Sequence, residues 1–97
     1  MFEIIQSKEF AKWFLGIRDQ KAREAVLIRM GRIQKGLLGD TKPVGDGVSE
    51  ARIHYGAGYR LYFIKRGTEI IVMLGGGDKS SQERDILKAK KIASEWR

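Results

Sequence analysis

The stretch from residue 48 to residue 74 most constrains the fold, because three short strand patterns follow one another with only tight turns between them. The expected strands are Val48–Tyr55, Tyr59–Lys65 and Glu69–Leu74. Their connections, Gly56-Ala57-Gly58 and Arg66-Gly67-Thr68, have the length and composition of β-hairpin loops. The chain is therefore expected to build a small antiparallel sheet.

Two amphipathic helices are expected before this group of strands, after a short first strand over Phe2–Gln6. Ser7 is placed to cap the first helix, and Asp19 is placed to cap a second helix that runs to about Lys35. Apolar residues recur at helical spacing in both segments. They are Phe10, Trp13, Phe14 and Ile17 in the first, and Ala22, Val26, Met30 and Ile33 in the second.

The remaining segments complete the expected order β-α-α-β-β-β-α. The glycine-rich residues 36–47 are predicted to be one loop, and Gly75-Gly76-Gly77 is predicted to end the last strand. Ser80-Ser81-Gln82-Glu83 resembles a capping box that starts a C-terminal helix, whose apolar face holds Ile86, Ala89, Ala93 and Trp96. We therefore expect an α+β fold with a helical hairpin on one sheet face and the other face partly open.

Composition narrows the class of protein. Ninety-seven residues suffice for one domain over 1–97. With no cysteine and one histidine, neither a metal site nor a cofactor is expected. No apolar run is long enough to span a membrane and no signal peptide is visible, so a cytoplasmic protein is expected. The net charge of +7 favours nucleic acid, a nucleic-acid machine or an acidic protein as partner.

The segment Glu50–Arg60 carries the clearest chemical signal. Strand alternation puts Arg52 and His54 on the face opposite Ala51 and Ile53, and Arg60 begins the next strand. Two arginines beside the only histidine would form a cationic site with a titratable group. Such a site is suited to bind a phosphate by forked hydrogen bonds and to transfer a proton near neutral pH.

Four sequence blocks together resemble the RelE/ParE superfamily of toxins, and most closely its HigB-like branch, the phage-related addiction-module killer proteins. The blocks are Gly36-Leu37-Leu38-Gly39-Asp40, Gly47-Val48-Ser49-Glu50-Ala51-Arg52-Ile53, Gly56-Ala57-Gly58-Tyr59-Arg60-Leu61-Tyr62 and Gly76-Gly77-Asp78-Lys79-Ser80-Ser81-Gln82. The resemblance implies the toxin of a type II toxin–antitoxin system. It also implies a metal-free endoribonuclease that cuts mRNA on the ribosome, restrained by an antitoxin with a helix-turn-helix domain, similar to HigA.

The resemblance implies catalytic positions at Arg52, His54, Arg60 and Lys79. Tyr59 and Tyr62 are candidates to stack on RNA bases, and Arg29, Arg32 and Arg84 are candidates to contact RNA phosphates. Many family members carry a tyrosine or a second histidine near the C-terminus. This chain has Gln82, Glu83, Arg84 and Asp85 there, so the general acid and base are not assigned by the motif.

Alternatives remain open at this stage. A ParE-like toxin with DNA gyrase as its target would have the same fold, and a non-enzymatic RNA-binding module would have the same charge. Arg60 could pair with Glu50 instead of a phosphate, and Tyr62 could belong to the core.

Overall fold

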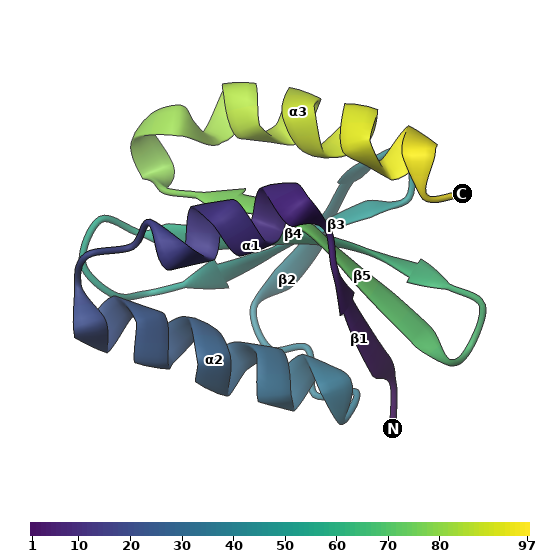
Figure 1. The fold of residues 1–97 in the computed structure, drawn as a ribbon, viewed down its shortest axis with the longest axis horizontal. Helices are drawn as coiled ribbons and strands as arrows, with labels where there is room; N and C mark the ends of the chain where they lie inside the picture. Colours follow the sequence, from purple (N-terminus) through teal and green to yellow (C-terminus); the bar gives the residue numbers. More distant parts are fainter.

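The computed structural model describes residues 1–97 as a five-stranded sheet with three helices (Figure 1). The strands are ordered β1-β5-β4-β3-β2, with β1 parallel to β5 and every other pair antiparallel. A short 3₁₀ turn, Lys79–Ser81, precedes the last helix. The elements in chain order are β1 (Glu3–Gln6), α1 (Lys8–Leu15), α2 (Gln20–Gln34), β2 (Thr41–Gly45), β3 (Val48–Ile53), β4 (Tyr59–Arg66), β5 (Ile70–Gly77) and α3 (Gln82–Glu95).

The two predicted caps of the N-terminal helices are confirmed. The Ser7 hydroxyl accepts the backbone N–H of Phe10 at 3.0 Å. The Asp19 carboxylate accepts the N–H groups of Lys21 and Ala22 at 2.9 and 3.3 Å. Each cap satisfies donors that a helix N-terminus leaves unpaired, and so fixes where the helix starts.

The predicted capping box at Ser80 is wrong. Asp78 accepts both the N–H and the hydroxyl of Ser80, at 2.8 and 2.6 Å, so that hydroxyl is engaged before the helix starts. Ser81 is the N-cap residue of α3, and its side chain makes no capping bond. The hydroxyl of Ser81 instead donates to Asp85, one turn into the helix.

The prediction of a single loop over residues 36–47 is also wrong, because Thr41–Gly45 forms the edge strand β2. Its partner is β3, with Pro43 opposite Ser49 and a register shift between Pro43 and Gly45. An edge strand tolerates proline because one side of it needs no N–H donor. Asp46 and Gly47 both have positive φ, as a tight two-residue hairpin turn requires.

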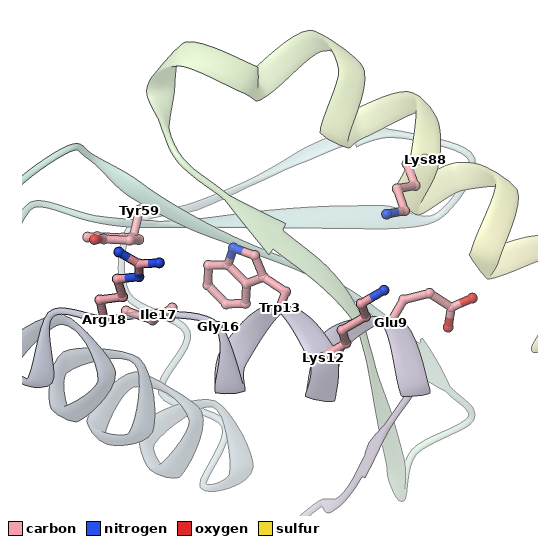
Figure 2. A pocket seen from close by; sticks show the side chains of 8 residues that line it. All are labelled: Glu9, Lys12, Trp13, Gly16, Ile17, Arg18, Tyr59 and Lys88. Atoms are coloured by element: carbon pink, nitrogen blue, oxygen red, sulfur yellow. The ribbon is translucent and has the colours of Figure 1, made fainter.

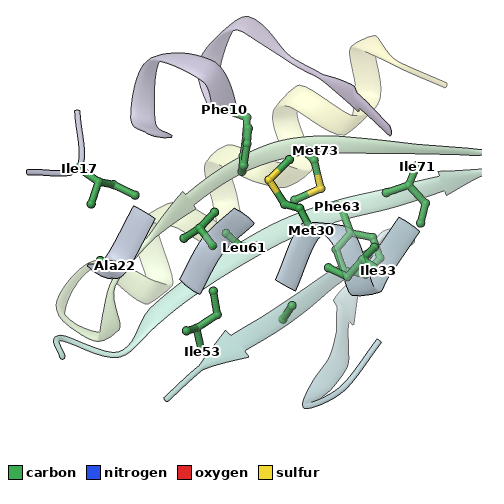
Figure 3. Close-up of a cluster of buried hydrophobic side chains, with 12 residues drawn as sticks. Phe10, Ile17, Ala22, Met30, Ile33, Ile53, Leu61, Phe63, Ile71 and Met73 are labelled. Carbon is green, nitrogen blue, oxygen red and sulfur yellow. The ribbon is translucent and has the colours of Figure 1, made fainter. Parts of the chain in front are cut away.

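Hydrophobic side chains form two clusters, one on each face of the sheet. Helices α1 and α2 cover the first, where Phe10, Met30 and Ile33 meet Phe63 and Met73 (Figure 3). Helix α3 covers the second through Ala89, Ile92 and Ala93, over inward residues of β3, β4 and β5. Of its predicted apolar face, Ile86 and Trp96 lie at the border of this cluster. Helix α3 does not cover the end of the sheet near Arg52 and His54. Arg52 is half-buried there, and His54 is exposed.

Strand β5 continues through the three glycines that were expected to end it, and two of them allow close packing. A Cβ at Gly76 would overlap the Trp13 ring of α1, and one at Gly77 would overlap the Asp85 carboxylate of α3. Figure 2 shows the indole of Trp13 beside this strand. The missing side chains therefore let helices on opposite faces approach neighbouring residues of one strand.

Candidate functional site

A hollow of about 320 Å³ lies where β3 ends and β4 begins. All four predicted catalytic residues line it, together with one of the predicted stacking residues. The lining residues are Arg52, Ile53, His54, Gly58, Tyr59, Arg60 and Lys79. We call this depression the β3–β4 hollow.

Arg52 and Arg60 are brought together by strand register. They lie directly opposite each other in the antiparallel pair β3–β4, so their side chains share one face. Like charges at such a position repel, and each arginine has an acidic neighbour. Arg52 donates to Asp40 at 3.1 Å, and the Nε atom of Arg60 lies 3.8 Å from the Glu50 carboxylate.

His54 reaches the hollow from the residue after β3. Its side chain is 74% exposed, and its Nε2 atom lies 2.6 Å from the second oxygen of Asp40. Hydrogen bonds from His54 and then Arg52 hold the pKa of the Asp40 carboxyl below its usual value. Because Asp40 holds Nε2, the Nδ1 atom of the ring is the nitrogen without a protein partner in this arrangement.

Arg60 is nine-tenths buried, and its position is fixed from two sides. One terminal nitrogen donates to the carbonyl of Gly58 at 2.9 Å, while the buried Nε atom has no hydrogen-bond partner. The fully buried Glu50 beside it accepts from Tyr62 at 3.0 Å and from Gln82 at 3.0 Å. The alternative that Arg60 pairs with Glu50 is thus realised while Arg60 also lines the hollow.

Lys79 reaches the hollow from a different part of the chain. It follows β5 in the 3₁₀ turn, and its backbone N–H donates to the carbonyl of Ala57 in the β3–β4 turn at 3.3 Å. Its side chain is exposed. The contact brings the end of β5 next to the hairpin that carries Tyr59 and Arg60.

The predicted RNA-contacting residues are distributed differently. Tyr62 cannot stack on a base, because it is completely buried and its hydroxyl donates to Glu50; burial is also the first cause that raises its pKa. Arg29 is half-buried and donates to the carbonyl of Arg52 at 2.7 Å, which makes it a support of β3. Burial lowers the pKa of Arg29. Arg32 and Arg84 are exposed but lie outside the β3–β4 hollow.

Asp40 is the residue that sequence reasoning missed. It immediately precedes β2, in a segment that resembles a turn from its glycines alone. The backbone N–H of Arg52 donates to its carbonyl at 2.9 Å, which anchors it next to β3. Recognition of β2 as a strand paired with β3 would have indicated it, since Thr41 lies opposite Ala51.

Two findings bear on other kinds of site. No group of three or more acidic or histidine side chains is arranged to hold a metal ion. None of the three helices combines the length and the apolar character needed to span a membrane.

Comparison with solved structures supports the predicted fold. The chain is similar to one in the crystal structure of the intact E. coli RelBE toxin–antitoxin complex, with a TM-score of 0.67. The match covers 80% of this chain and 96% of that chain, at 10% sequence identity. The α+β fold is therefore RelE-like, as the sequence predicted.

Comparison of sequences gives a nearer relative. No family model matches the chain. An uncharacterized protein of Haemophilus influenzae is 40% identical to it over 86 residues, which make up 89% of this chain and 87% of that protein. The chain belongs to the same family as this Haemophilus influenzae protein.

Proposed function

We propose that the protein is the toxin of a type II toxin–antitoxin system, of the HigB-like branch, and that it cuts mRNA on the ribosome. The convergence of Arg52, His54, Arg60 and Lys79 on one open hollow is the observation that carries this proposal. The RelE-like fold and the four sequence blocks add support. An imidazole among cationic side chains, as His54 is here, suits the cleavage of a phosphodiester. A toxin that only binds gyrase does not need such a group.

In the proposed reaction, the ribose 2′-oxygen attacks the adjacent phosphorus and the bond to the 5′-oxygen breaks. The products are a 2′,3′-cyclic phosphate and a 5′-hydroxyl. His54 takes the proton of the 2′-hydroxyl on Nδ1, because Asp40 holds Nε2 at 2.6 Å and orients the ring. Asp40 is thus a positioning residue in this scheme.

The cations have separate roles in the proposal. Arg52 and Arg60 bind the scissile phosphate and offset the negative charge that develops on it. Lys79, which also lines the hollow, gives a proton to the departing 5′-oxygen in this scheme. Tyr59 supplies an aromatic surface at the border of the hollow for a neighbouring base.

Single-turnover cleavage of mRNA on programmed ribosomes tests this function. His54→Ala should lower the rate by about 100-fold or more, since it removes the proposed base. Arg60→Lys keeps a cation beside Glu50 and removes the forked donors, so it should lower the rate while a thermal melt shows an intact fold. Arg66→Ala, at the exposed far end of β4, is the matched control.

Two outcomes would contradict the proposal. Cleavage that is unaffected by both His54→Ala and Arg60→Lys would remove the β3–β4 hollow from the chemistry. Intact mRNA in growth-arrested cells, together with defects in DNA supercoiling, would assign the protein to the gyrase-directed toxins instead.

The proposed partners are the ribosome with its mRNA and a cognate antitoxin with a helix-turn-helix domain. An antitoxin that opposes a chain of net charge +7 should carry an acidic segment. A small gene next to this one that encodes such a protein would support the assignment. Its product should co-purify with the chain and stop cleavage.

A further inference from the structure

A second depression lies on the molecule outside the β3–β4 hollow. It consists of two adjoining hollows between α1 and α3, with volumes of about 630 and 370 Å³. Both are lined by Glu9, Trp13 and Lys88. Figure 2 shows the residues that line the larger one. We call the pair the α1–α3 cleft.

The smaller hollow of the cleft lies beside the part of β5 that β1 does not pair with. Strand β1 pairs with β5 only as far as Met73. The next residues of β5, Leu74 to Gly76, line the smaller hollow. Because Gly75 and Gly76 have no side chains, part of the lining of the smaller hollow is backbone.

The side chains around the cleft combine cations with aromatic rings. Four of its lining residues are basic and two are acidic. The basic ones are Lys12, Arg18, Arg84 and Lys88, and the acidic ones are Glu9 and Asp85. Arg84, which lies outside the β3–β4 hollow, therefore has a place here.

Trp13 gives the cleft a rigid aromatic wall. Its ring packs against Phe10, with ring centroids 5.7 Å apart, and it lies against the bare Cα of Gly76. The side chain is nevertheless only half-buried, so part of the indole faces the cleft. Trp13, which belongs to the predicted apolar face of the first helix, therefore packs against the core and also lines the cleft.

Tyr59 connects the two depressions, because it lines both the β3–β4 hollow and the larger hollow of the cleft. Figure 2 shows Arg18 close to Tyr59, with Trp13 further along the same hollow. A strand of RNA with one phosphate in the β3–β4 hollow would meet Tyr59, then Arg18, then Trp13. This order alternates aromatic faces and cations, as surfaces that bind single strands do.

We propose that the α1–α3 cleft binds the single-stranded RNA next to the scissile phosphate. The proposal rests on the proposed function, since it extends the same substrate beyond the cut site. The bases of this RNA segment stack on Trp13 and Tyr59, and its phosphates pair with Arg18 and Lys12. Continuity with the β3–β4 hollow through Tyr59 favours RNA over an acidic peptide, which would need the cations but not a shared aromatic border.

The test uses fluorescence of Trp13 in a full-length Trp96→Phe protein, since the chain has two tryptophans. The probe is a 2′-O-methylated octanucleotide, which cannot be cut because its 2′-oxygens carry no proton. The octanucleotide should quench Trp13. Lys12→Ala/Arg18→Ala should weaken binding by about tenfold and lower the slope of log affinity against log salt by about 1.4, the value for two lost phosphate contacts on a single strand.

Arg66→Ala/Lys91→Ala is the matched control, since it removes the same charge from exposed positions outside both depressions. It should retain the Trp13 quenching. Equal affinities and salt slopes in the two double variants would overturn the assignment. Quenching by polyglutamate but not by the octanucleotide would overturn it too and would give the cleft to an acidic peptide.

The result can be separated from the test of function. If the protein binds the octanucleotide through the cleft but leaves mRNA on ribosomes intact, the cleft assignment stands and the nuclease function is refuted. If the protein cuts mRNA but the cleft variant and the control variant bind the octanucleotide equally well, the nuclease function stands and the cleft assignment is refuted.

Discussion

Asp40 places a carboxylate against the two side chains that a phosphate would approach. It bonds Arg52 at 3.1 Å and His54 at 2.6 Å. In the proposed reaction it has opposed effects, because it orients the histidine but occupies part of the guanidinium that a phosphate needs. Binding and catalysis should therefore respond to its removal in opposite directions.

We predict that Asp40→Asn slows single-turnover cleavage by about tenfold or more, since the amide no longer holds the ring as the carboxylate does. The same change should tighten binding of the 2′-O-methylated octanucleotide by about fivefold, the effect of one removed charge near a phosphate in water. Rates on ribosomes and dissociation constants measure the two effects. Loss of both rate and affinity would argue against the opposed roles.

We also predict that Asp40 makes the stability of the folded protein depend on pH in the acid range. Its pKa is lowered in the folded protein, first by the bond from His54 and then by the bond from Arg52. The stability that these bonds contribute is present above the unfolded pKa, whose usual value is 3.8, and is lost as pH falls through the lower folded pKa. Urea unfolding at pH values from about 5 to about 2 measures this effect. The free energy of unfolding should fall less steeply with decreasing pH in Asp40→Asn than in the parent protein. Identical pH profiles would contradict the ionised bond.

Residue-level reasoning from sequence succeeded where the signal is local. The caps Ser7 and Asp19 bond to residues two or three positions away, and alternation in β3 and β4 set the common face of Arg52 and Arg60. It could not decide between the two roles left open for Tyr62, and the structure shows the buried one. A tyrosine next to a predicted phosphate-binding arginine looks the same in the sequence whether it faces solvent or a buried glutamate. Asp40 was missed because its partners, Arg52 and His54, lie 12 and 14 residues away in the sequence.

At the scale of elements, β5 illustrates how glycines mislead a reading by composition. Three glycines in a row predict a turn, yet here they continue a strand that must accept helices at close range. Strand β2 was hidden in the same way by glycines and Pro43, because an edge strand has weak pairing demands. The error at β5 concerns glycine used for close packing, which depends on neighbours that the sequence does not reveal. The error at β2 arose because positive-φ glycines flank a short edge strand.

We predict that Gly76→Ala lowers the free energy of unfolding by about 1–3 kcal/mol, the usual effect of forcing an extra methyl into a packed site. The added Cβ would overlap the ring of Trp13, which is fixed by Phe10. Gly75→Ala is the matched control, because a Cβ there meets nothing within 4 Å. Chemical denaturation of both variants measures the difference, and equal stabilities would contradict the packing described for β5.

At the scale of the whole molecule, the protein is too small to enclose an RNA. Its extents are 33 × 28 × 23 Å, and the β3–β4 hollow of about 320 Å³ accommodates little more than one nucleotide unit. The net charge of +7 favours encounter with any polyanion but gives no orientation. In the proposed function, the ribosome that presents the mRNA supplies most of the orientation of the scissile phosphate, and the α1–α3 cleft adds only contacts to the adjoining nucleotides.

We therefore predict that free mRNA is cut more slowly than the same mRNA on programmed ribosomes, by about two orders of magnitude or more, since orientation then has to be found by chance. Single-turnover rates on the two substrates measure the ratio. Comparable rates would mean that the chain positions its substrate unaided.

The parallel pairing of β1 with β5 has a consequence for the timing of synthesis. Strand β1 has only one partner strand, and the hydroxyl of Ser7 donates to a carbonyl 67 residues further along the chain. Translation must pass residue 74 before all the contacts of β1 and Ser7 with β5 can form, and Lys79 is made later still. A half-made copy thus lacks both a closed sheet and a complete hollow, so under the proposed function only a copy translated past these residues could cut mRNA.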